Sequence, residues 1–315
     1  MTLQPKIHAL QTRFQRNPGV AFVAHGELIA AHVENQVASA RIFLQGAQVS
    51  SFCRKNQKDL LWLSPTCDFK TGNSLRGGIP ICWPWFGEFS RNDRLLTNQI
   101  AVPTGFPMPA HGLVRSMAWD LASIDDRSPD CTNLTFGLLF DGKNPRWPFR
   151  SELFYRVSVG ERLDVSLTIN NTDELPQTFT EALHTYFAIG DHQHTTLGGL
   201  ENLDYMDAFG DWKNFTQGPG LNVGQPLNRV YQQNPRRLPV EIIDAAWGRT
   251  LAVTSPESAS TVIWNPGLEH GKKLSCFPTD AYRGMVCVEN GNVLRNFVTL
   301  PAGRSHTLSA QFTIK

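Results

Sequence analysis

Two side chains far apart in the chain have the chemistry to exchange protons with a bound ligand. His184 lies in a strand-like run, where alternation places it on the face opposite Leu183 and Phe187 and suits it to a cavity. Glu289 alternates with Cys287 on an otherwise apolar strand face, just before an Asn-Gly turn. Partial desolvation raises the pKa of such a carboxyl group and makes it a better base. The residues alone leave open that His184 is a hydrogen-bonded structural histidine and that Glu289 is an exposed acid at a strand end.

Arg76 could present its guanidinium group to an anion, and His111 and Arg115 form a second candidate group. Arg76 precedes Gly77 and Gly78, whose backbone freedom lets the planar guanidinium group reach a ligand. His111 and Arg115 follow a proline-rich approach, so a hydrogen-bond donor and a cation could lie together at the mouth of a sheet. Since His-Gly pairs are common in loops, a solvated loop explains the His111 motif equally well. Any anion recognition by these residues is expected to be local.

Asp207 lies beside an aromatic residue in a segment that could bind a sugar. It alternates with Tyr205, and such a pair suits a sugar because the carboxylate accepts hydroxyl hydrogen bonds while the ring stacks on C–H groups. A surface acid is the competing interpretation. Trp83, Trp85 and Trp264 could wall a site, but packing explains them better, because most buried aromatic residues belong to the core.

The elements that must position these residues are mainly short strands. The clearest pair lies within 152–170, where apolar residues alternate strictly with polar ones, as in an antiparallel sheet with one wet face. Ile7, Leu10 and Phe14 have helical spacing, which predicts a short helix that ends before Asn17. The chain shows no long amphipathic helix beyond this one. The pattern therefore favours an all-β sandwich or barrel of antiparallel sheets over a βαβ fold.

One domain spanning 1–315 is expected, with 1–19 as an N-terminal helical extension, because no linker divides the chain. Further short strands, bounded by turn residues, are predicted at 134–140, 177–187, 251–253, 261–264, 284–289 and 308–314. The stretch 209–237, with many Gly, Pro, Asn and Gln residues, is predicted to be a long surface excursion. Loops of this length are usually functional or mobile.

Composition and charge exclude several classes of protein. Hydrophobic residues make up 41% of the chain and charged residues 18%, which indicates a folded globular protein. With a net charge of +1, the chain has no broad basic field for nucleic acid or an anionic membrane. Apolar runs end well before the ~20 residues of a membrane span, and the N-terminus does not resemble a secretory signal. The six scattered cysteines lack metal-site spacing, so we expect reduced thiols, a cytoplasmic location and no metal site.

In this order, the motifs resemble those of the hexose-6-phosphate mutarotase branch of the aldose 1-epimerase family. They extend from Arg76 to Glu289, over most of the chain. The matching residues are Arg76-Gly77-Gly78-Ile79-Pro80, Trp83-Pro84, Phe86-Gly87, His111-Gly112-Leu113-Val114-Arg115, Glu181-Ala182-Leu183-His184-Thr185-Tyr186-Phe187, Tyr205-Met206-Asp207, Trp264-Asn265-Pro266 and Val288-Glu289. Each motif is weak by itself, whereas the ordered set is specific.

The resemblance implies a galactose-mutarotase-like β-supersandwich of antiparallel sheets. It also implies an isomerase that interconverts the α and β anomers of a hexose 6-phosphate, such as glucose 6-phosphate, with no cofactor. His184 and Glu289 would be the catalytic pair, and the substrate would be bound by Arg76, His111, Arg115 and Asp207. Some members of the family carry Gln at the position of Ala110, so the hexose preference stays open. The expected partner is a small-molecule hexose phosphate, and the expected form is a monomer.

Two other functions fit parts of the pattern. A non-catalytic protein that binds carbohydrate or sugar phosphate would share the sandwich, the aromatic residues and the arginines. It would not need a histidine and a glutamate facing one cavity. A glycoside hydrolase needs two carboxylates that flank the scissile bond, and Asp207 is the obvious partner for Glu289. The pairing of His184 with Glu289 counts against both alternatives.

Overall fold

A computed structural model describes residues 3–102, 106–233 and 238–315. Most of their regular secondary structure is β-strand. Within these residues, every pairing between named strands is antiparallel. The all-β prediction is therefore confirmed. The α-helices of these residues are short, and no helix among them is long and apolar enough to cross a membrane. They are α1 (Gln4–Arg13), α2 (Arg94–Thr97) and α3 (Gly267–Gly271).

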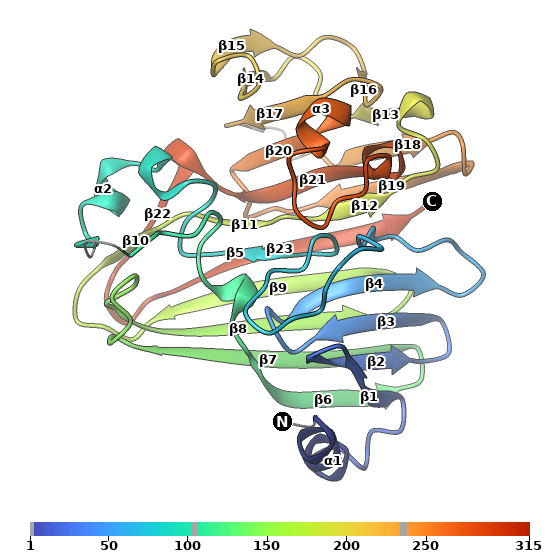
Figure 1. Ribbon diagram of the computed structural model, residues 1–315, viewed down its shortest axis with the longest axis vertical. Coiled ribbons are helices and arrows are strands. Elements are labelled where there is room, and N and C mark those ends of the chain that lie inside the picture. The colour runs from blue at the N-terminus through green and yellow to red at the C-terminus, as the bar shows by residue number, and fades with distance from the viewer. Residues whose placement is uncertain (1–2, 103–105, 234–237) are drawn as a thin grey trace.

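A nine-stranded sheet of the described residues follows the predicted alternation most closely. Its strands β6 to β9 lie side by side in Figure 1. In β9 the buried positions alternate with partly exposed ones along the whole strand, so one face belongs to the core. Pairing with β8 places Val157 opposite Val165 on that buried face. In spatial order the strands are β16 (Leu221–Asn222), β13 (Thr195–Gly198), β18 (Val240–Asp244), β19 (Arg249–Thr254), β23 (Ser305–Ile314), β9 (Leu163–Asn171), β8 (Arg150–Val159), β7 (Cys131–Asp141) and β6 (Asp120–Ser128).

An eight-stranded sheet carries Asp207 and Glu289, and His184 lies between two of its strands. Its strand β21 is buried at every position, so both faces of this strand are covered. In spatial order the described strands are β15 (Lys213–Thr216), β14 (Asp204–Asp207), β17 (Leu227–Tyr231), β20 (Ser260–Asn265), β21 (Met285–Asn292), β11 (Glu181–Leu183) and β5 (Ile81–Cys82), with β12 (Tyr186–Ala188) paired to β21.

Two smaller sheets and several 3₁₀-helices complete the described fold. A four-stranded sheet consists of β1 (Val20–His25), β2 (Leu28–Glu34), β3 (Ala38–Phe43) and β4 (Gln48–Arg54), and a two-stranded one of β10 (Gln177–Phe179) and β22 (Val298–Leu300). Strand β3 contacts β8, and apolar side chains from both sheets belong to one core cluster. The 3₁₀-helices are η1 (Phe89–Arg91), η2 (Val114–Ser116), η3 (His192–His194), η4 (Ala281–Gly284) and η5 (Leu294–Asn296).

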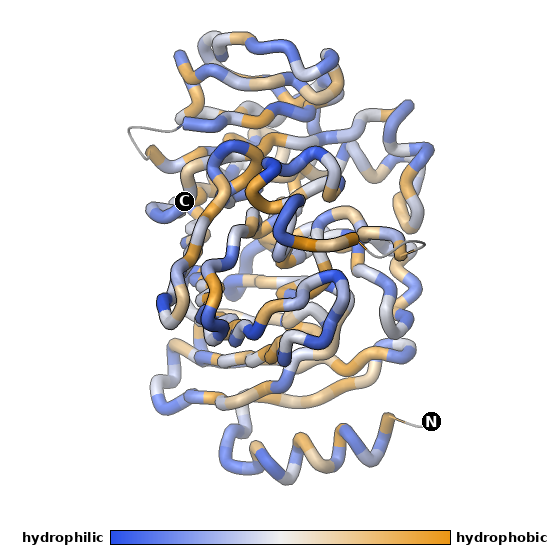
Figure 2. Tube along the Cα trace, turned by 90° about the vertical axis from the view of Figure 1, so that its left-hand side faces the viewer, coloured by the Kyte–Doolittle hydropathy of each residue, from blue (hydrophilic) through white to orange (hydrophobic). Residues whose placement is uncertain are grey.

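The predicted N-terminal helix is present as α1, at the lower end of the molecule in Figure 1. Hydrophobic and hydrophilic residues alternate around its coil (Figure 2). Ile7 is buried against the core, and the ring of Phe14 lies 6.0 Å from the ring of Phe22 on β1. The helix is therefore packed through the apolar residues whose spacing predicted it.

The segment that runs from Arg76 through β5 to Trp85 is closely packed. Trp83 and Trp85 are fully buried, and the rings of Trp83 and Trp147 lie 4.9 Å apart, so their predicted packing role is confirmed. Gly78 has a positive φ of 65°, and a Cβ there would lie 2.2 Å from the carbonyl oxygen of Val49. Glycine is therefore required where this segment crosses β4.

The predicted excursion at 209–237 contains more structure than a loop. Its residues 213–216, 221–222 and 227–231 form the strands β15, β16 and β17. Positions 234–237 lie outside the described residues. Strand β17 joins the eight-stranded sheet because Arg229 and Val230 pair with Ile263 and Val262 of β20. Turn residues dominated the composition of this stretch, and its short apolar runs acquire strand geometry only through distant partners.

Candidate active site

One cavity brings five of the six predicted site residues together. It has a volume of about 450 Å³ and is lined by Arg76, His111, Arg115, His184 and Glu289. These residues come from five separate segments of the chain, so the clustering is a result of folding. Aromatic walls surround the five residues and are formed by Phe86, Tyr186, Trp212 and Trp264.

Glu289 lies in the middle of β21, opposite Val262 of β20. The predicted Asn-Gly turn after it is wrong, because Asn290 and Gly291 continue the strand and pair with β11. Glu289 is only 2% exposed, which rules out the exposed strand-end acid. Its Oε2 has no hydrogen-bond partner among the described residues. Burial raises the pKa of this carboxyl group well above its ordinary value.

His184 lies at the break between β11 and β12, so the predicted continuous strand through it is wrong. The break is held where the backbone N–H of His184 donates to the carbonyl of Pro80 over 3.0 Å. The ring is buried and stacks on Tyr186 with centroids 4.8 Å apart and an angle of 6° between the planes. Burial, followed by electrostatic interactions with His111, Arg115 and Arg76, lowers the pKa of His184 well below its ordinary value.

The imidazole of His184 and the carboxyl group of Glu289 face each other. His184 Nδ1 lies 3.5 Å from Glu289 Oε1, within ion-pair range but without a hydrogen bond among the described residues. Buried polar atoms are normally hydrogen-bonded, so it is unusual that His184 Nδ1 and the other carboxyl oxygen of Glu289, Oε2, have no partner among the described residues. Both atoms are therefore available to a ligand that enters the cavity.

His111 supplies a neutral hydrogen-bonding group to the same cavity. Its ring lies 5.2 Å from the ring of His184 and meets Phe86 edge-on at 4.9 Å. Burial, followed by the charges of Arg115 and Arg76, lowers the pKa of His111 to about 3. The backbone N–H of Gly87 donates to His111 Nδ1 over 3.4 Å. The ring proton of the neutral imidazole consequently belongs on Nε2, which makes Nε2 a donor.

Two arginines give the cavity its positive charge. Arg76 Nε donates to the carbonyl of Ser275 over 2.8 Å, and Arg115 Nη2 donates to that of Ala110 over 2.7 Å. Among the described residues these are the only side-chain hydrogen bonds that either arginine makes, so the remaining N–H groups of each fork can bind an anion. A third arginine, Arg91, also lines the cavity, but Glu88 compensates its charge at 3.3 Å.

Asp207 is the predicted site residue that the structure places outside the cavity lining. Its Oδ1 accepts hydrogen bonds from the backbone N–H groups of Phe209 and Gly210, over 2.9 and 3.1 Å. This carboxylate therefore holds the turn between β14 and β15. Its role in substrate binding remains a prediction.

Trp212 is a cavity residue that the sequence reasoning missed. It follows the turn held by Asp207, and its ring lies 5.3 Å below the guanidinium carbon of Arg91. Asp211 and Trp212 both have positive φ, 56° and 60°, which few bulky residues adopt. The tryptophan stood within the predicted excursion, and an aromatic residue in a polar, turn-rich stretch was the available signal.

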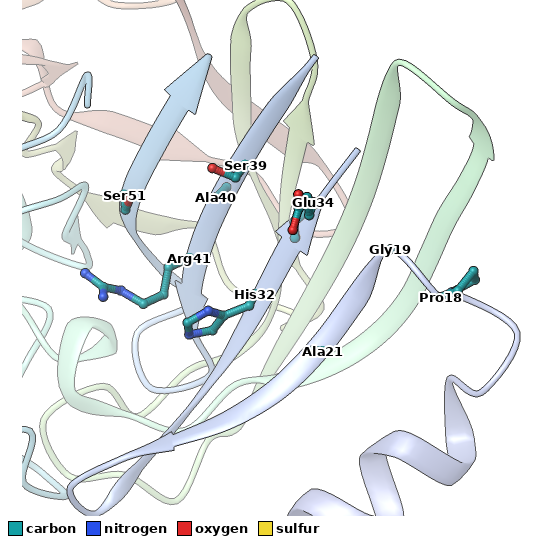
Figure 3. A pocket seen from close by; sticks show the side chains of 10 residues that line it. Pro18, Gly19, Ala21, His32, Glu34, Ser39, Ala40, Arg41 and Ser51 are labelled. Atoms are coloured by element: carbon teal, nitrogen blue, oxygen red, sulfur yellow. The ribbon is translucent and has the colours of Figure 1, made fainter. Parts of the chain in front are cut away.

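A second pocket of about 350 Å³ lies on the four-stranded sheet (Figure 3). Figure 3 shows His32 and Arg41 projecting from neighbouring strands, and none of the six predicted site residues lines this pocket. His32 Nε2 lies 2.9 Å from His25 Nε2, and Arg41 Nε donates to Ser50 Oγ over 2.9 Å. His32 and Arg41 therefore have partners within the protein, whereas the 450 Å³ cavity is lined by His184 and Glu289, which each have an unpartnered buried atom.

The cavity can perform a particular kind of chemistry. A buried carboxyl group and a buried imidazole can take a proton from one ligand oxygen and give a proton to another. A neutral histidine can donate a hydrogen bond to the same ligand, and two arginines can hold an anionic group at a distance from the proton transfer. The aromatic walls suit the apolar faces of a ring-shaped ligand.

Comparisons with known proteins agree with one another. A family model described as aldose 1-epimerase matches residues 31–313. A relative in Escherichia coli (strain K12), provisionally named glucose-6-phosphate 1-epimerase, is 32% identical over 286 residues, which cover 90% of each chain. A relative of the same provisional name in Cenchrus ciliaris is 32% identical over 275 residues, which cover 83% of this chain and 77% of the relative. The crystal structure of YeaD from Salmonella typhimurium, described as a provisional mutarotase, has a TM-score of 0.83 at 28% identity and covers 98% of this chain and 99% of that chain.

Proposed function

The chain belongs to the aldose 1-epimerase family and is an isomerase, and on this premise we propose that it interconverts the α and β anomers of a hexose 6-phosphate such as glucose 6-phosphate. The observation that carries the proposal is the unbonded approach of His184 Nδ1 to Glu289 Oε1, at 3.5 Å, in a cavity with two arginines. The names of the relatives suggest a sugar phosphate as the substrate, and the two arginines could bind its phosphate group.

The reaction requires one base and one acid. An aldose ring opens when a proton leaves the hydroxyl group on C1 and another reaches the ring oxygen, and it closes on either face after rotation about the C1–C2 bond. Glu289 takes the C1 hydroxyl proton as general base, and His184 protonates the ring oxygen as general acid. The two roles reverse on closure, so the protein returns to its starting protonation state.

The substrate sets the proton arrangement that this assignment needs. In the free protein burial raises the pKa of Glu289 and lowers that of His184, so burial favours the uncharged form of each group. A C1 hydroxyl group that donates to Glu289 stabilises the carboxylate, and a ring oxygen that accepts from His184 stabilises the protonated imidazole. Binding of the sugar therefore favours transfer of the proton across the 3.5 Å gap between His184 and Glu289.

Arg76 and Arg115 bind the 6-phosphate, and His111 Nε2 donates to a sugar hydroxyl group. Guanidinium forks match phosphate oxygens in geometry and charge, and they stay charged when partly desolvated. We assign the phosphate to this pair because Arg91 is already neutralised by Glu88. The free thiols of all six cysteines support a cytoplasmic location, and we expect a monomer.

The test compares glucose 6-phosphate with glucose. Replacing either Arg76 or Arg115 with Ala removes charge-assisted hydrogen bonds of ~1.5–3 kcal/mol, so KM for the phosphosugar should rise by about 10- to 100-fold. Exchange of free glucose anomers should change little in both variants. NMR exchange spectroscopy measures both rates in one sample. Equal losses for the two sugars would contradict a phosphate role, and sugar-phosphate binding without anomer exchange would identify a binding protein.

A further inference from the structure

The catalytic end of the cavity also has the donor set of a soft-metal site. His184, Cys287 and Glu289 each offer one ligand atom, and these three atoms lie within 4.8 Å of one another. Nitrogen, thiolate sulfur and carboxylate oxygen are the ligands that Zn²⁺ takes in proteins. All three side chains are buried, so the donors converge away from bulk solvent.

We propose that Zn²⁺, or another thiophilic divalent ion, binds to His184, Cys287 and Glu289 and thereby blocks the cavity to sugars. Among the described residues this is the group in which at least three such donors converge. The proposal assigns the metal no part in the reaction. Because the ion uses the same nitrogen and carboxyl group as the sugar, metal and substrate exclude each other.

The geometry of the donors fits a tetrahedral ion with little movement. Bonds of about 2.0–2.2 Å to nitrogen and oxygen place those two atoms ~3.4 Å apart in a tetrahedron. His184 Nδ1 and Glu289 Oε1 are already 3.5 Å apart. With a zinc–sulfur bond of about 2.3 Å, the sulfur of Cys287 has to approach the other donors by about 1.2 Å at most.

Two unpartnered atoms point to a ligand at this place. Nδ1 of His184 and Oε2 of Glu289 are buried and accept no hydrogen bond from any described residue. Both residues also line the cavity, which gives an ion a path from solvent and leaves its fourth position open to water. When the ion binds, the protons of the Cys287 thiol and the Glu289 carboxyl group are released to solvent.

Substitution of Cys287 tests the metal site independently of the proposed reaction. The thiol lies on β21, two residues before Glu289, between the pairing partners Tyr186 and Trp264. The anomer exchange needs no thiol, whereas a soft metal depends on one. Cys287→Ala is consequently expected to keep the exchange and lose the metal. Cys131→Ala, at a partly exposed thiol on β7, is the matched control for unspecific binding of metal to cysteine.

The first measurement needs no sugar. Co²⁺ added to the free protein should produce thiolate-to-cobalt absorption in the wild type and in Cys131→Ala, and Zn²⁺ should abolish it by displacement. The absorption should be missing in Cys287→Ala and in Cys287→Ser, two variants of different polarity at this buried site. A wild-type protein without thiolate absorption, or a Cys287→Ala protein that retains it, overturns the proposal.

The second measurement is inhibition of anomer exchange by Zn²⁺, compared at equal metal and glucose 6-phosphate concentrations. Losing an outer-shell partner already weakens metal sites by about 10- to 100-fold, so loss of a direct ligand in Cys287→Ala should raise the inhibitory Zn²⁺ concentration by at least ~10-fold. A chelator should restore the wild-type rate. Equal sensitivity of the two proteins overturns the proposal. Thiolate absorption in a protein without any anomer exchange would support the metal site and contradict the proposed function.

Discussion

Two of the histidine–carboxylate pairs among the described residues lie at opposite ends of the same pair of strands, β11 and β21. Glu181 of β11 lies opposite Asn292 of β21, and its Oε1 lies 2.5 Å from His306 Nε2. At the other end of β11 and β21, His184 Nδ1 and Glu289 Oε1 are 3.5 Å apart and unbonded. The first pair joins the eight-stranded sheet to β23 of the nine-stranded sheet, and the second faces a cavity.

The contrast shows how one chemical pair serves either structure or reaction. Asn292 Nδ2 donates to Glu181 Oε1 over 3.0 Å, so the oxygen that faces His306 is also hydrogen-bonded to Asn292. Burial alone would lower the pKa of His306, but the hydrogen bond and charge of Glu181 outweigh it and raise that pKa. His184 has the opposite shift, because burial and neighbouring positive charges have no bonded carboxylate to offset them. A pair left without partners is the one that can bind and protonate a substrate.

The largest expected effect is a difference in kcat between variants of His184 and His306. Removing a general acid costs about 10²–10⁴-fold in kcat, so His184→Ala should lose that much of the anomer exchange. His306→Ala should retain a kcat close to that of the wild type, because His306 does not line the cavity. NMR exchange rates of glucose 6-phosphate measure both variants. A comparable loss of kcat in His306→Ala at a temperature where it is folded would remove the distinction.

Stability should respond in the reverse order. His306→Ala leaves the buried carboxylate of Glu181 without its cation, and breaking such a pair costs about 3 kcal/mol. The estimate is at the lower end of the usual range because the His306 side chain is 22% exposed. His184→Ala should change stability less, since it breaks no side-chain hydrogen bond among the described residues. Urea unfolding at pH 6 gives both values, and a larger loss in His184→Ala would contradict the account.

The two imidazoles should titrate on opposite sides of the ordinary histidine pKa. At pH 6.5 we expect His306 to be mostly protonated and His184 to be neutral, because their pKa values are raised and lowered from 6.5. Imidazole signals in NMR spectra recorded across the pH range report each charge state. His184→Gln and His306→Gln assign the two signals. Protonation of His184 above pH 6.5 in the free protein would be inconsistent with an unpartnered buried ring.

The smallest expected effect is on the pH dependence of stability. The folded pKa of His306 is raised above its unfolded value, so its pairing with Glu181 stabilises the protein fully below pH ~6.5. This contribution is lost as the pH rises through the folded pKa. The free energy of unfolding of His306→Gln relative to wild type, followed by urea titration, should therefore converge with rising pH. A difference that grows with pH would reverse the sign and contradict the pairing.

The local alternation of apolar and polar residues predicted the strands, but the geometry of the site depends on pairing between residues that are distant in the sequence. The alternation in 163–171 was enough to predict β9, because each residue's burial depends on a regular two-residue period. The same period failed at His184, where hydrogen bonding to Pro80 interrupts the strand. Asn and Gly are typical turn residues, yet Asn290 and Gly291 belong to β21 and pair with β20. A Cβ on Gly291 would lie 2.2 Å from the carbonyl oxygen of Glu181.

Most residues of the site could be predicted from the sequence, but their hydrogen bonding could not. Family resemblance identified five cavity residues that lie far apart in the sequence. It also selected Asp207, whose carboxylate is used by backbone N–H groups of its own turn, a local interaction that a motif does not reveal. The missing hydrogen bonds of His184 and Glu289 depend on what surrounds them in three dimensions. The same is true of the entry of Trp212 into the cavity.

The central claim is that the unpartnered Glu289 carboxyl group is the base of an anomer exchange, and Glu289→Gln tests it most directly. The amide keeps the size and polarity of the side chain and cannot accept the C1 hydroxyl proton. We predict that exchange between the anomers of glucose 6-phosphate, measured by NMR, falls to the uncatalysed rate while calorimetric binding of the sugar phosphate is largely retained. Exchange at the wild-type rate in a folded Glu289→Gln protein would contradict the account.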